Sequence, residues 1–255
     1  SPSLGHMPVS AARAAVAVRV SRQLVGALLG CGLGQLPLAC RALALHSLPS
    51  YALDLVRHVP YLPNYYPEHG HRAHPHRDPE WVDVGCFGAA RPFKNLVGQA
   101  VAAMMFASAV GRKLRFHING DRIECGGGPT VKNTEAVFAA NPNAELVRHD
   151  WMPHAEFKAL VGSMDLVTQV SFAETFCIVA ADAASQGVPL VTSKEVPWGA
   201  RIYQADPTDV NDMANAMGRA YSFRFVEDVF DGNRAGLRHY CDRTREIWLR
   251  YFGVD

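Results

Sequence analysis

Several absences narrow the class of protein that this sequence can encode. None of the 6 cysteines forms a C-x-x-C pair, so their spacing indicates neither a zinc site nor a disulfide framework. The 25 basic and 24 acidic residues leave a net charge of +1, which indicates neither a nucleic acid nor a membrane partner. Cys86 and Cys177 lie in apolar runs, and we expect buried thiols in a reducing, cytoplasmic setting.

The sequence also lacks a long uninterrupted apolar run. Residues 23–40 carry no charge, but glycines and Pro37 interrupt them, and they are shorter than the roughly 20 strongly apolar residues of a spanning helix. A signal peptide is the alternative, with Ala42-Leu43-Ala44 as its cleavage site, but Arg41 beside that site argues against it. We therefore expect no membrane span.

What is present is a globular composition, 49% hydrophobic and 19% charged, which excludes disordered, collagen-like and coiled-coil classes. Residues 1–6 resemble a cloning remnant, so Met7 is the expected natural start. Residues 7–60 contain five arginines and one acidic residue, Asp54. They indicate a short, mostly helical segment with helices near 10–29 and 36–57.

A proline-containing linker is expected over residues 61–80. Pro63 and Pro67 favour an extended chain at its start. Four histidines follow and allow either a metal site or a solvated loop: His69, His71, His74 and His76. No acidic or cysteine partner is placed with them, so the solvated loop is the favoured interpretation and no metal is expected.

From residue 81 to 222, apolar runs of strand length alternate with amphipathic helical stretches. The strands are expected at 82–88, 114–119, 145–148, 165–170 and 188–192, with a further one at 200–204. The helices are expected at 94–110, 129–140, 153–163, 176–186, 208–221 and 235–251. Nearly continuous apolar strands between helices predict an α/β fold, a doubly wound parallel sheet whose ligand lies at the carboxyl ends of the strands.

Two of these strand ends carry residues suited to a phosphorylated ligand. Gly88 comes at the end of the first strand, and Arg91 and Lys94 come shortly after Gly88, beside the start of a helix. The guanidinium fork of Arg91 and the ammonium group of Lys94 both suit a diphosphate. Asn119 and Gly120 end the second strand, where a small residue lets a ligand approach the backbone. Taken alone, each segment is equally consistent with an ordinary loop.

The third strand end is aromatic, since Trp151 and Met152 follow it and offer an apolar wall for a base. The triplet Gly126-Gly127-Gly128 lies between the second strand and the next helix. Its spacing does not fit a dinucleotide-binding fingerprint, so we interpret it as a flexible loop.

The fourth strand end is the most informative. Glu174 precedes a helix and Asp182 lies about two turns into it, on the same side. The backbone N–H groups of Thr175, Phe176 and Cys177 are expected to open that helix and to form an anion site. An acid beside such a site suits the hydroxyl groups of a sugar, and the buried position of Asp182 requires a polar partner.

In order and spacing, these four segments resemble the donor-binding half of retaining GT-B-type glycosyltransferases, the "group 1" nucleotide-sugar enzymes. The resemblance covers residues 61–222 and is strongest in Ser171-x-x-Glu174-Thr175-Phe176, which runs into Ser185-Gln186-Gly187-Val188-Pro189. The form Gly85-Cys86-Phe87-Gly88-Ala89-x-Arg91-Pro92-x-Lys94-Asn95 looks most similar to enzymes of tailed phages and environmental sequences.

The resemblance implies a role for each charged residue. Arg91 and Lys94 would bind the diphosphate of a UDP- or GDP-linked sugar and stabilise the leaving group. Glu174 would hold hydroxyl groups of the donor sugar. Asp182, where the family usually has Glu, would bind the ribose.

The resemblance also places the other donor-binding residues. Thr175 and Phe176 would present backbone N–H groups to the phosphates, and Trp151 and Met152 would flank the base. Gly88, Asn119 and Gly120 would line the donor site as small or polar turn residues. No metal or other cofactor is required in this family.

One departure from the family concerns the acceptor half, because only about 60 residues precede the linker. His46 is the candidate for the family's catalytic histidine, although a histidine on a helix face is the simpler interpretation. Residues 223–255 would cross back and pack on residues 7–60.

The acceptor could be a glycan or a hydroxymethylated DNA base, and a homo-oligomer is possible. The alternatives are a nucleotide-sugar-binding module without catalysis and an interaction protein that has lost its ligand.

Overall fold

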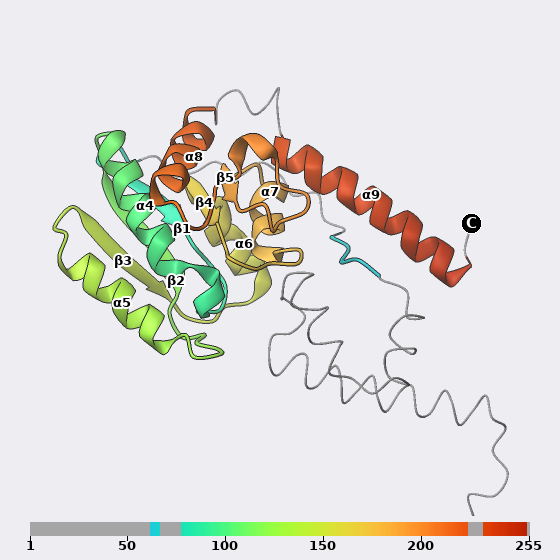
Figure 1. Cartoon of the computed structure of the whole chain (residues 1–255), viewed down its shortest axis with the longest axis horizontal. Helices are drawn as coiled ribbons and strands as arrows, with labels where there is room; N and C mark the ends of the chain where they lie inside the picture. The colour runs from blue at the N-terminus through green and yellow to red at the C-terminus, as the bar shows by residue number, and fades with distance from the viewer. Residues whose placement is uncertain (1–61, 67–77, 224–231, 254–255) are drawn as a thin grey trace, which may run out of the picture. The chain divides into compact units, whose positions relative to one another are not determined.

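The computed structural model describes residues 62–66, 78–223 and 232–253 (Figure 1). The expected helices at 10–29 and 36–57, His46 and the four linker histidines lie outside these residues. So does any packing of the C-terminal helix on residues 7–60.

The described residues form one parallel sheet in the order β3-β2-β1-β4-β5 (Figure 1). Its strands are β1 (Trp81–Gly85), β2 (Lys113–Asn119), β3 (Ala144–His149), β4 (Leu166–Gln169) and β5 (Leu190–Thr192). The order reverses between β1 and β4, which pair in parallel at Val84–Leu166 and Gly85–Val167. Crossovers that leave β1 in opposite directions create a crevice at the carboxyl ends of these strands.

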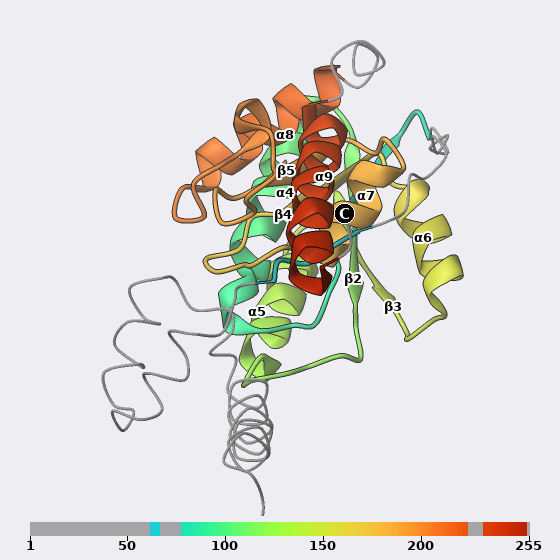
Figure 2. The same cartoon turned by 90° about the vertical axis from the view of Figure 1, so that its right-hand side faces the viewer.

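Helices cover both faces of the sheet, which confirms the predicted doubly wound α/β class. The first face carries α4 (Leu96–Ala109), α5 (Gly128–Ala139) and α8 (Val210–Ser222). The second carries α6 (His154–Gly162), α7 (Ile178–Ser185) and α9 (Gly232–Phe252). Figure 2, which faces α9, shows this long helix lying over α7.

Side-chain alternation along the strands builds the two cores. Val82, Val84, Leu114 and Phe116 point to the first face and are fully buried there. The second core combines strand residues such as Val167 with α7 and α9. Strands buried on both faces explain why the apolar runs of the sequence are nearly continuous.

The prediction of a strand at 200–204 is wrong. Residues Arg201–Tyr203 form a single 3-10 turn, closed by the Tyr203 N–H donating to the Ala200 carbonyl at 2.9 Å. Only Gln204 pairs with the sheet, through one isolated bridge to Thr192. The Ala200 N–H donates to Asn233 Oδ1 of α9 instead, so side-chain partners replace a strand ladder here.

One buried amide ties the two central loops to the sheet. Gln99 of α4 accepts hydrogen bonds at Oε1 from the Val170 N–H at 2.7 Å and the Thr168 hydroxyl at 2.8 Å. Its Nε2 donates to the Lys94 carbonyl at 2.7 Å. Gln99 therefore holds the end of β4 and the loop after β1 together.

Replacing Gln99 with Leu should lower the free energy of unfolding by about 2–4 kcal/mol, because three polar groups would lose their buried partner. Urea denaturation measures this loss. Ser108→Leu, which places the same side chain at an exposed position of α4, is the control. Equal stability of the two variants would contradict the role assigned to Gln99.

Candidate functional site

The loops at the carboxyl ends of β1, β2 and β3 enclose a cavity of about 480 Å³. Helices α6 and α7 complete its wall through His154, Phe157 and Val179. The other lining residues are Gly88, Asn119, Asp121, Arg122, His149, Trp151 and Met152. The cavity thus includes four of the predicted donor-binding residues: Gly88, Asn119, Trp151 and Met152. Trp151 is 83% exposed, so its ring lies open to solvent at the edge of the cavity.

Gly88 and Asn119 join the first two strand ends. The Gly88 N–H donates to Asn119 Oδ1 at 2.7 Å, and Gly88 has a φ of 109°, a conformation that favours glycine. Gly120 has a different role, because a Cβ atom there would lie 2.6 Å from the Nε atom of Arg148. The small size of Gly120 therefore accommodates Arg148, and Gly120 does not line the cavity.

Lys94 and Glu174 form an ion pair between the loops after β1 and β4. The side chains are 18% and 5% exposed. The Phe172 N–H donates to the Phe93 carbonyl at 2.9 Å and fixes the two loops side by side. Burial opposes the positive charge on Lys94, but the charge and hydrogen bond of the Glu174 carboxylate favour it, and the pKa of Lys94 is raised.

Arg91 is held by a carboxylate that the sequence analysis did not identify. Its Nε atom donates to Glu124 Oε2 at 2.8 Å, and its Nη2 atom contacts the same oxygen. Hydrogen bonds from Arg91 and Arg122 lower the pKa of Glu124. Both cations assigned to a diphosphate therefore already hold a carboxylate.

The glycine-rich segment before α5 is packed against the loop after β1. The Ala90 N–H donates to the Arg122 carbonyl at 2.8 Å, and the Glu124 N–H donates to the Ala90 carbonyl at 3.0 Å. Gly127 lies so close to the Ala90 carbonyl that a Cβ atom would collide with it. Gly127 therefore has a packing role that the interpretation of residues 126–128 as a flexible loop did not include, since this contact requires glycine.

Helix α7 begins at Ile178, two residues later than predicted. Cys177 precedes it in a left-handed conformation, with a φ of 61°, so the N–H groups of Thr175 to Cys177 do not open the helix as expected. The Thr175 N–H donates to Oε1 of the preceding residue, Glu174, at 3.2 Å. The Phe176 side chain is buried against Trp198, whose Nε1 atom donates to the Phe176 carbonyl at 2.8 Å.

The two thiols beside this site are buried, as the sequence predicts. Burial raises the pKa of Cys86 and that of Cys177 to about 12. Both thiols therefore stay protonated at neutral pH, and neither has the thiolate character of a nucleophile.

Asp182 is 1% exposed and has the polar partners that its burial requires. Its Oδ1 atom accepts from the Tyr66 hydroxyl at 2.7 Å and lies 3.0 Å from His154 Nε2. His154 lines the cavity and Asp182 does not, so within the described residues Asp182 is connected to the cavity only through the His154 ring. Neither Tyr66 nor His154 carried a signal in the sequence that pointed to Asp182, because they lie 116 and 28 residues away.

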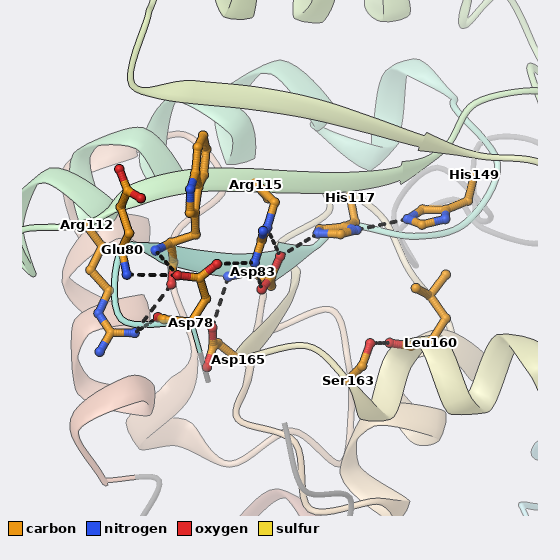
Figure 3. Close-up of polar contacts among 11 residues, drawn as sticks. Asp78, Glu80, Asp83, Arg112, Arg115, His117, His149, Leu160, Ser163 and Asp165 are labelled. Atoms are coloured by element: carbon orange, nitrogen blue, oxygen red, sulfur yellow. Dashed lines mark hydrogen bonds and ion pairs between the residues drawn. The ribbon is translucent and has the colours of Figure 1, made fainter. Parts of the chain in front are cut away.

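A second polar group, which the sequence analysis missed, crosses the sheet on the face turned toward α6 (Figure 3). Asp83 of β1 binds Arg115 of β2 through two hydrogen bonds, of 2.6 and 2.8 Å. His117 Nε2 lies 2.9 Å from Asp83 Oδ1, and His117 Nδ1 lies 2.9 Å from His149 Nε2. The polar row therefore ends in the cavity, at His149.

Electrostatics fix the charge at both ends of this row. Burial would raise the pKa of Asp83, but hydrogen bonds from His117 and Arg115 outweigh burial and lower it from 3.8 to about 2. Burial lowers the pKa of His149. At neutral pH, Asp83 is therefore a carboxylate and His149 an uncharged imidazole.

Two features are absent from the described residues, a metal-binding cluster and a membrane-spanning helix. No group of three or more His, Cys, Asp and Glu side chains is arranged to hold a metal ion in this part of the chain. None of its helices combines the length and apolarity needed to cross a bilayer.

The sequence matches no protein-family model and no curated protein. The fold is nevertheless similar to solved structures. TarM from S. aureus, in a mutant form with fondaparinux, alpha-GlcNAc-glycerol and UDP, has a TM-score of 0.57 and 17% identity, over 86% of this chain and 43% of that chain.

Two synthases are also similar. An alpha,alpha-trehalose-phosphate synthase (UDP-forming) from Burkholderia xenovorans has a TM-score of 0.52 and 14% identity, over 67% of this chain and 43% of that one. The sucrose-phosphate synthase from Thermosynechococcus elongatus has a TM-score of 0.52 and 17% identity, over 68% and 46%. These structural neighbours are glycosyltransferases of the GT-B type, and the likeness is one of fold. The chain spans less than half the length of each of them.

Replacing Asp83 with Asn should destabilise the protein at neutral pH by about 2 kcal/mol, the free-energy equivalent of the lowered pKa. Because the folded-state pKa lies below the unfolded value, this stability is present above pH 3.8 and is lost as the pH falls toward 2.

Denaturant unfolding between pH 7 and pH 3 measures the difference between wild type and variant, which should shrink at the acid end. Asp242→Asn, at an exposed position of α9, is the control. A difference that stays constant down to pH 3 would show that the loss comes from packing alone.

Proposed function

We propose that this chain is a glycosyltransferase that binds a nucleotide-diphosphate sugar at the carboxyl edge of its sheet. The buried Lys94–Glu174 pair beside the cavity is the observation that carries the proposal. Gly88 and Asn119 line both the cavity and a small void that Lys94 borders. A nucleoside in the cavity would thus place its phosphates toward Lys94.

Each charged residue has a part in donor binding. Lys94 offsets the negative charge that develops on the leaving diphosphate, which is electrostatic stabilisation of the transition state. Glu174 accepts hydrogen bonds from sugar hydroxyls and keeps Lys94 oriented. Arg91 offers a guanidinium fork for a phosphate once it exchanges Glu124 for the ligand. Asp182 binds the ribose hydroxyl groups, either through His154 or directly once the ribose has displaced His154 from the carboxylate.

The similar structures support the choice of nucleotide. The TarM structure contains UDP, and the trehalose-phosphate synthase is a UDP-forming enzyme. A UDP-linked donor is therefore the first candidate and a GDP-linked donor the second. Transfer is proposed to proceed with retention of the anomeric configuration and without a metal ion.

The acceptor is a glycan or, as in a phage-type enzyme, a hydroxymethylated DNA base. A DNA acceptor needs a basic surface for its phosphates, and the arginines of residues 1–60 with Arg72 and Arg77 are the proposed source of it. His46 remains the proposed catalytic histidine, and a homo-oligomer and a cytoplasmic location remain part of the proposal. The alternative is a nucleotide-sugar-binding module without turnover. Release of free nucleotide in the presence of acceptors would exclude this alternative.

Ligand-induced stabilisation tests donor binding. A matching nucleotide sugar at about 100 times its Kd should stabilise the chain by about 2.7 kcal/mol, or raise the Tm by about 5–10 °C. A panel of UDP-, GDP-, ADP- and dTDP-sugars identifies the nucleotide. Glu174→Gln should reduce the shift for the sugar nucleotide more than for the free nucleotide.

Glu80→Gln is the matched control, because Glu80 forms an ion pair with Lys113 that is exposed and far along the sheet from the cavity. It should leave the ligand-induced shift unchanged. If no nucleotide sugar stabilises the wild type, the proposed donor site is wrong for this chain.

The Arg91–Glu124 pair generates a separate prediction. Glu124→Gln removes the carboxylate that a phosphate must displace, so UDP should bind about two- to fivefold more tightly, the equivalent of an exposed ion pair. Arg91→Met should weaken UDP binding. Uridine, which has no phosphate, should bind the wild type and Arg91→Met equally in calorimetry, and a change in uridine affinity on Arg91→Met would contradict phosphate exchange.

A further inference from the structure

The polar row Asp83–His117–His149 determines which hydrogen-bonding group the cavity offers to a ligand. Its three members come from three adjacent strands, and Figure 3 shows them in line, with His149 at the end. The His117 and His149 rings are stacked, with centroids 5.2 Å apart and an interplanar angle of 13°. Phe87 packs at 6.1 Å from the His149 ring, so the ring is held on two sides.

The direction of the hydrogen bonds follows from the carboxylate. Asp83 is ionised and can only accept, so His117 carries its hydrogen on Nε2 and donates to Asp83. We assign a single hydrogen to each ring, because the Arg115 guanidinium already pairs with the Asp83 carboxylate through two hydrogen bonds; His117 Nδ1 then accepts from His149. His149 must therefore carry its hydrogen on Nε2, which leaves its Nδ1 atom as an acceptor.

This remaining nitrogen is available to a ligand. No described residue forms a hydrogen bond with His149 Nδ1, and the atom is not among the buried side-chain atoms of the described chain that lack a partner. His149 lines the cavity beside Met152 and Phe157. An acceptor with one fixed direction therefore faces a mostly apolar recess.

We propose that His149 Nδ1 accepts a hydrogen bond from the ring N–H of a nucleobase, and so selects uracil, thymine or guanine against cytosine and adenine. The proposal rests on the proposed function, because it assigns the nucleoside to this cavity. Uracil and thymine carry this hydrogen on N3 and guanine carries it on N1, next to a carbonyl group. Cytosine and adenine have a lone pair at the corresponding nitrogen, which would face the lone pair of His149.

Flanking groups of the cavity fit the same bases. Arg122 is exposed beyond its contact with Glu124 and offers donors to the base carbonyls. Asp121 lines the same wall and offers an acceptor to the amino group of guanine. His117 and Asp83 do not touch the base in this arrangement and act as positioning residues that fix the hydrogen on His149.

Nucleotide affinities measured by calorimetry test the selection. UDP should bind about tenfold or more tightly than CDP, and GDP about tenfold or more tightly than ADP, because the mismatched pair leaves polar groups unsatisfied. N3-methyl-UDP, which has lost the ring hydrogen, should bind as weakly as CDP. His149→Phe should make UDP, CDP and N3-methyl-UDP bind within about twofold of one another.

The variant separates a hydrogen bond from a steric effect. If the methyl group merely collides with the cavity wall, N3-methyl-UDP stays weak in His149→Phe, and the inference is overturned. His239→Phe, the same change at an exposed position of α9, should retain the wild-type order. Should His149→Phe not fold, equal binding of UDP, CDP and N3-methyl-UDP to the wild type would still overturn the inference.

The positioning role has its own readout, the nitrogen NMR signals of His149. The wild type should show a hydrogen on Nε2 and none on Nδ1. His117→Phe should give a mixture of the two forms and reduce the preference for UDP over CDP, whereas His117→Gln, whose amide oxygen can accept from His149, should restore both. A His149 spectrum that His117→Phe leaves unchanged would contradict this role.

The failure of the inference and that of the proposed function are distinguishable. If nucleotides bind but do not discriminate by the ring hydrogen, the inference is wrong and the donor site stands. If no nucleotide binds to the wild type at all, both are wrong.

Discussion

A charge removed from water must be paired within the protein, and this constraint organises the whole carboxyl edge of the sheet. At this edge Lys94 meets Glu174 and Arg91 meets Glu124, and inside the sheet Asp83 meets Arg115. Each pair joins two segments that follow or belong to different strands. The loops are therefore held in place by the same charged groups that a phosphorylated sugar would engage.

Pairing within the protein means that a ligand competes with a partner already present. The Lys94–Glu174 pair is nearly buried, whereas the Arg91–Glu124 pair is partly exposed. An exposed pair contributes little net stability, so its exchange for a phosphate costs little. The buried pair is harder to separate, and a ligand that contacts both of its members keeps it intact. Arg91 thus suits an adjustable contact, and Lys94 with Glu174 suits a fixed one.

The sequence predicted the order and type of the elements because local patterns encode them. The apolar run at 165–170 and the amphipathic pattern at 208–221 correspond to β4 and α8 within a few residues. Residues 200–204 were misjudged because the Ala200 N–H donates to Asn233 of α9, far along the chain, while the Tyr203 and Gln204 N–H groups bond locally within a 3-10 turn. The start of α7 was placed two residues early, since a left-handed Cys177 has no local signature in the sequence.

The candidate site, too, could be predicted from the sequence only in part. Lys94 and Glu174 were identified as members of one site because both follow buried strands, and parallel strand ends share an edge. Their direct contact was not predicted, nor were Glu124, Tyr66 and His154 as partners. Such pairs depend on strand order and on side-chain rotamers. Asp83 and His117 escaped notice for another reason: they lie inside strands, where the pattern indicates only burial.

The position of Asp83 and His117 inside strands fixes the geometry of the polar row. Asp83 and His117 belong to β1 and β2, and His149 is the last residue of β3, so the backbone ladder fixes their spacing. The charged loop residues lack that constraint. A nucleotide spanning both regions would meet rigid hydrogen-bond geometry at its base and exchangeable ion pairs at its phosphates. Selectivity among bases would then rest on His149 and affinity for phosphate on Lys94 and Arg91. A substitution at His149 would leave the contribution of these two cations largely unchanged, as expected for groups with no shared partner.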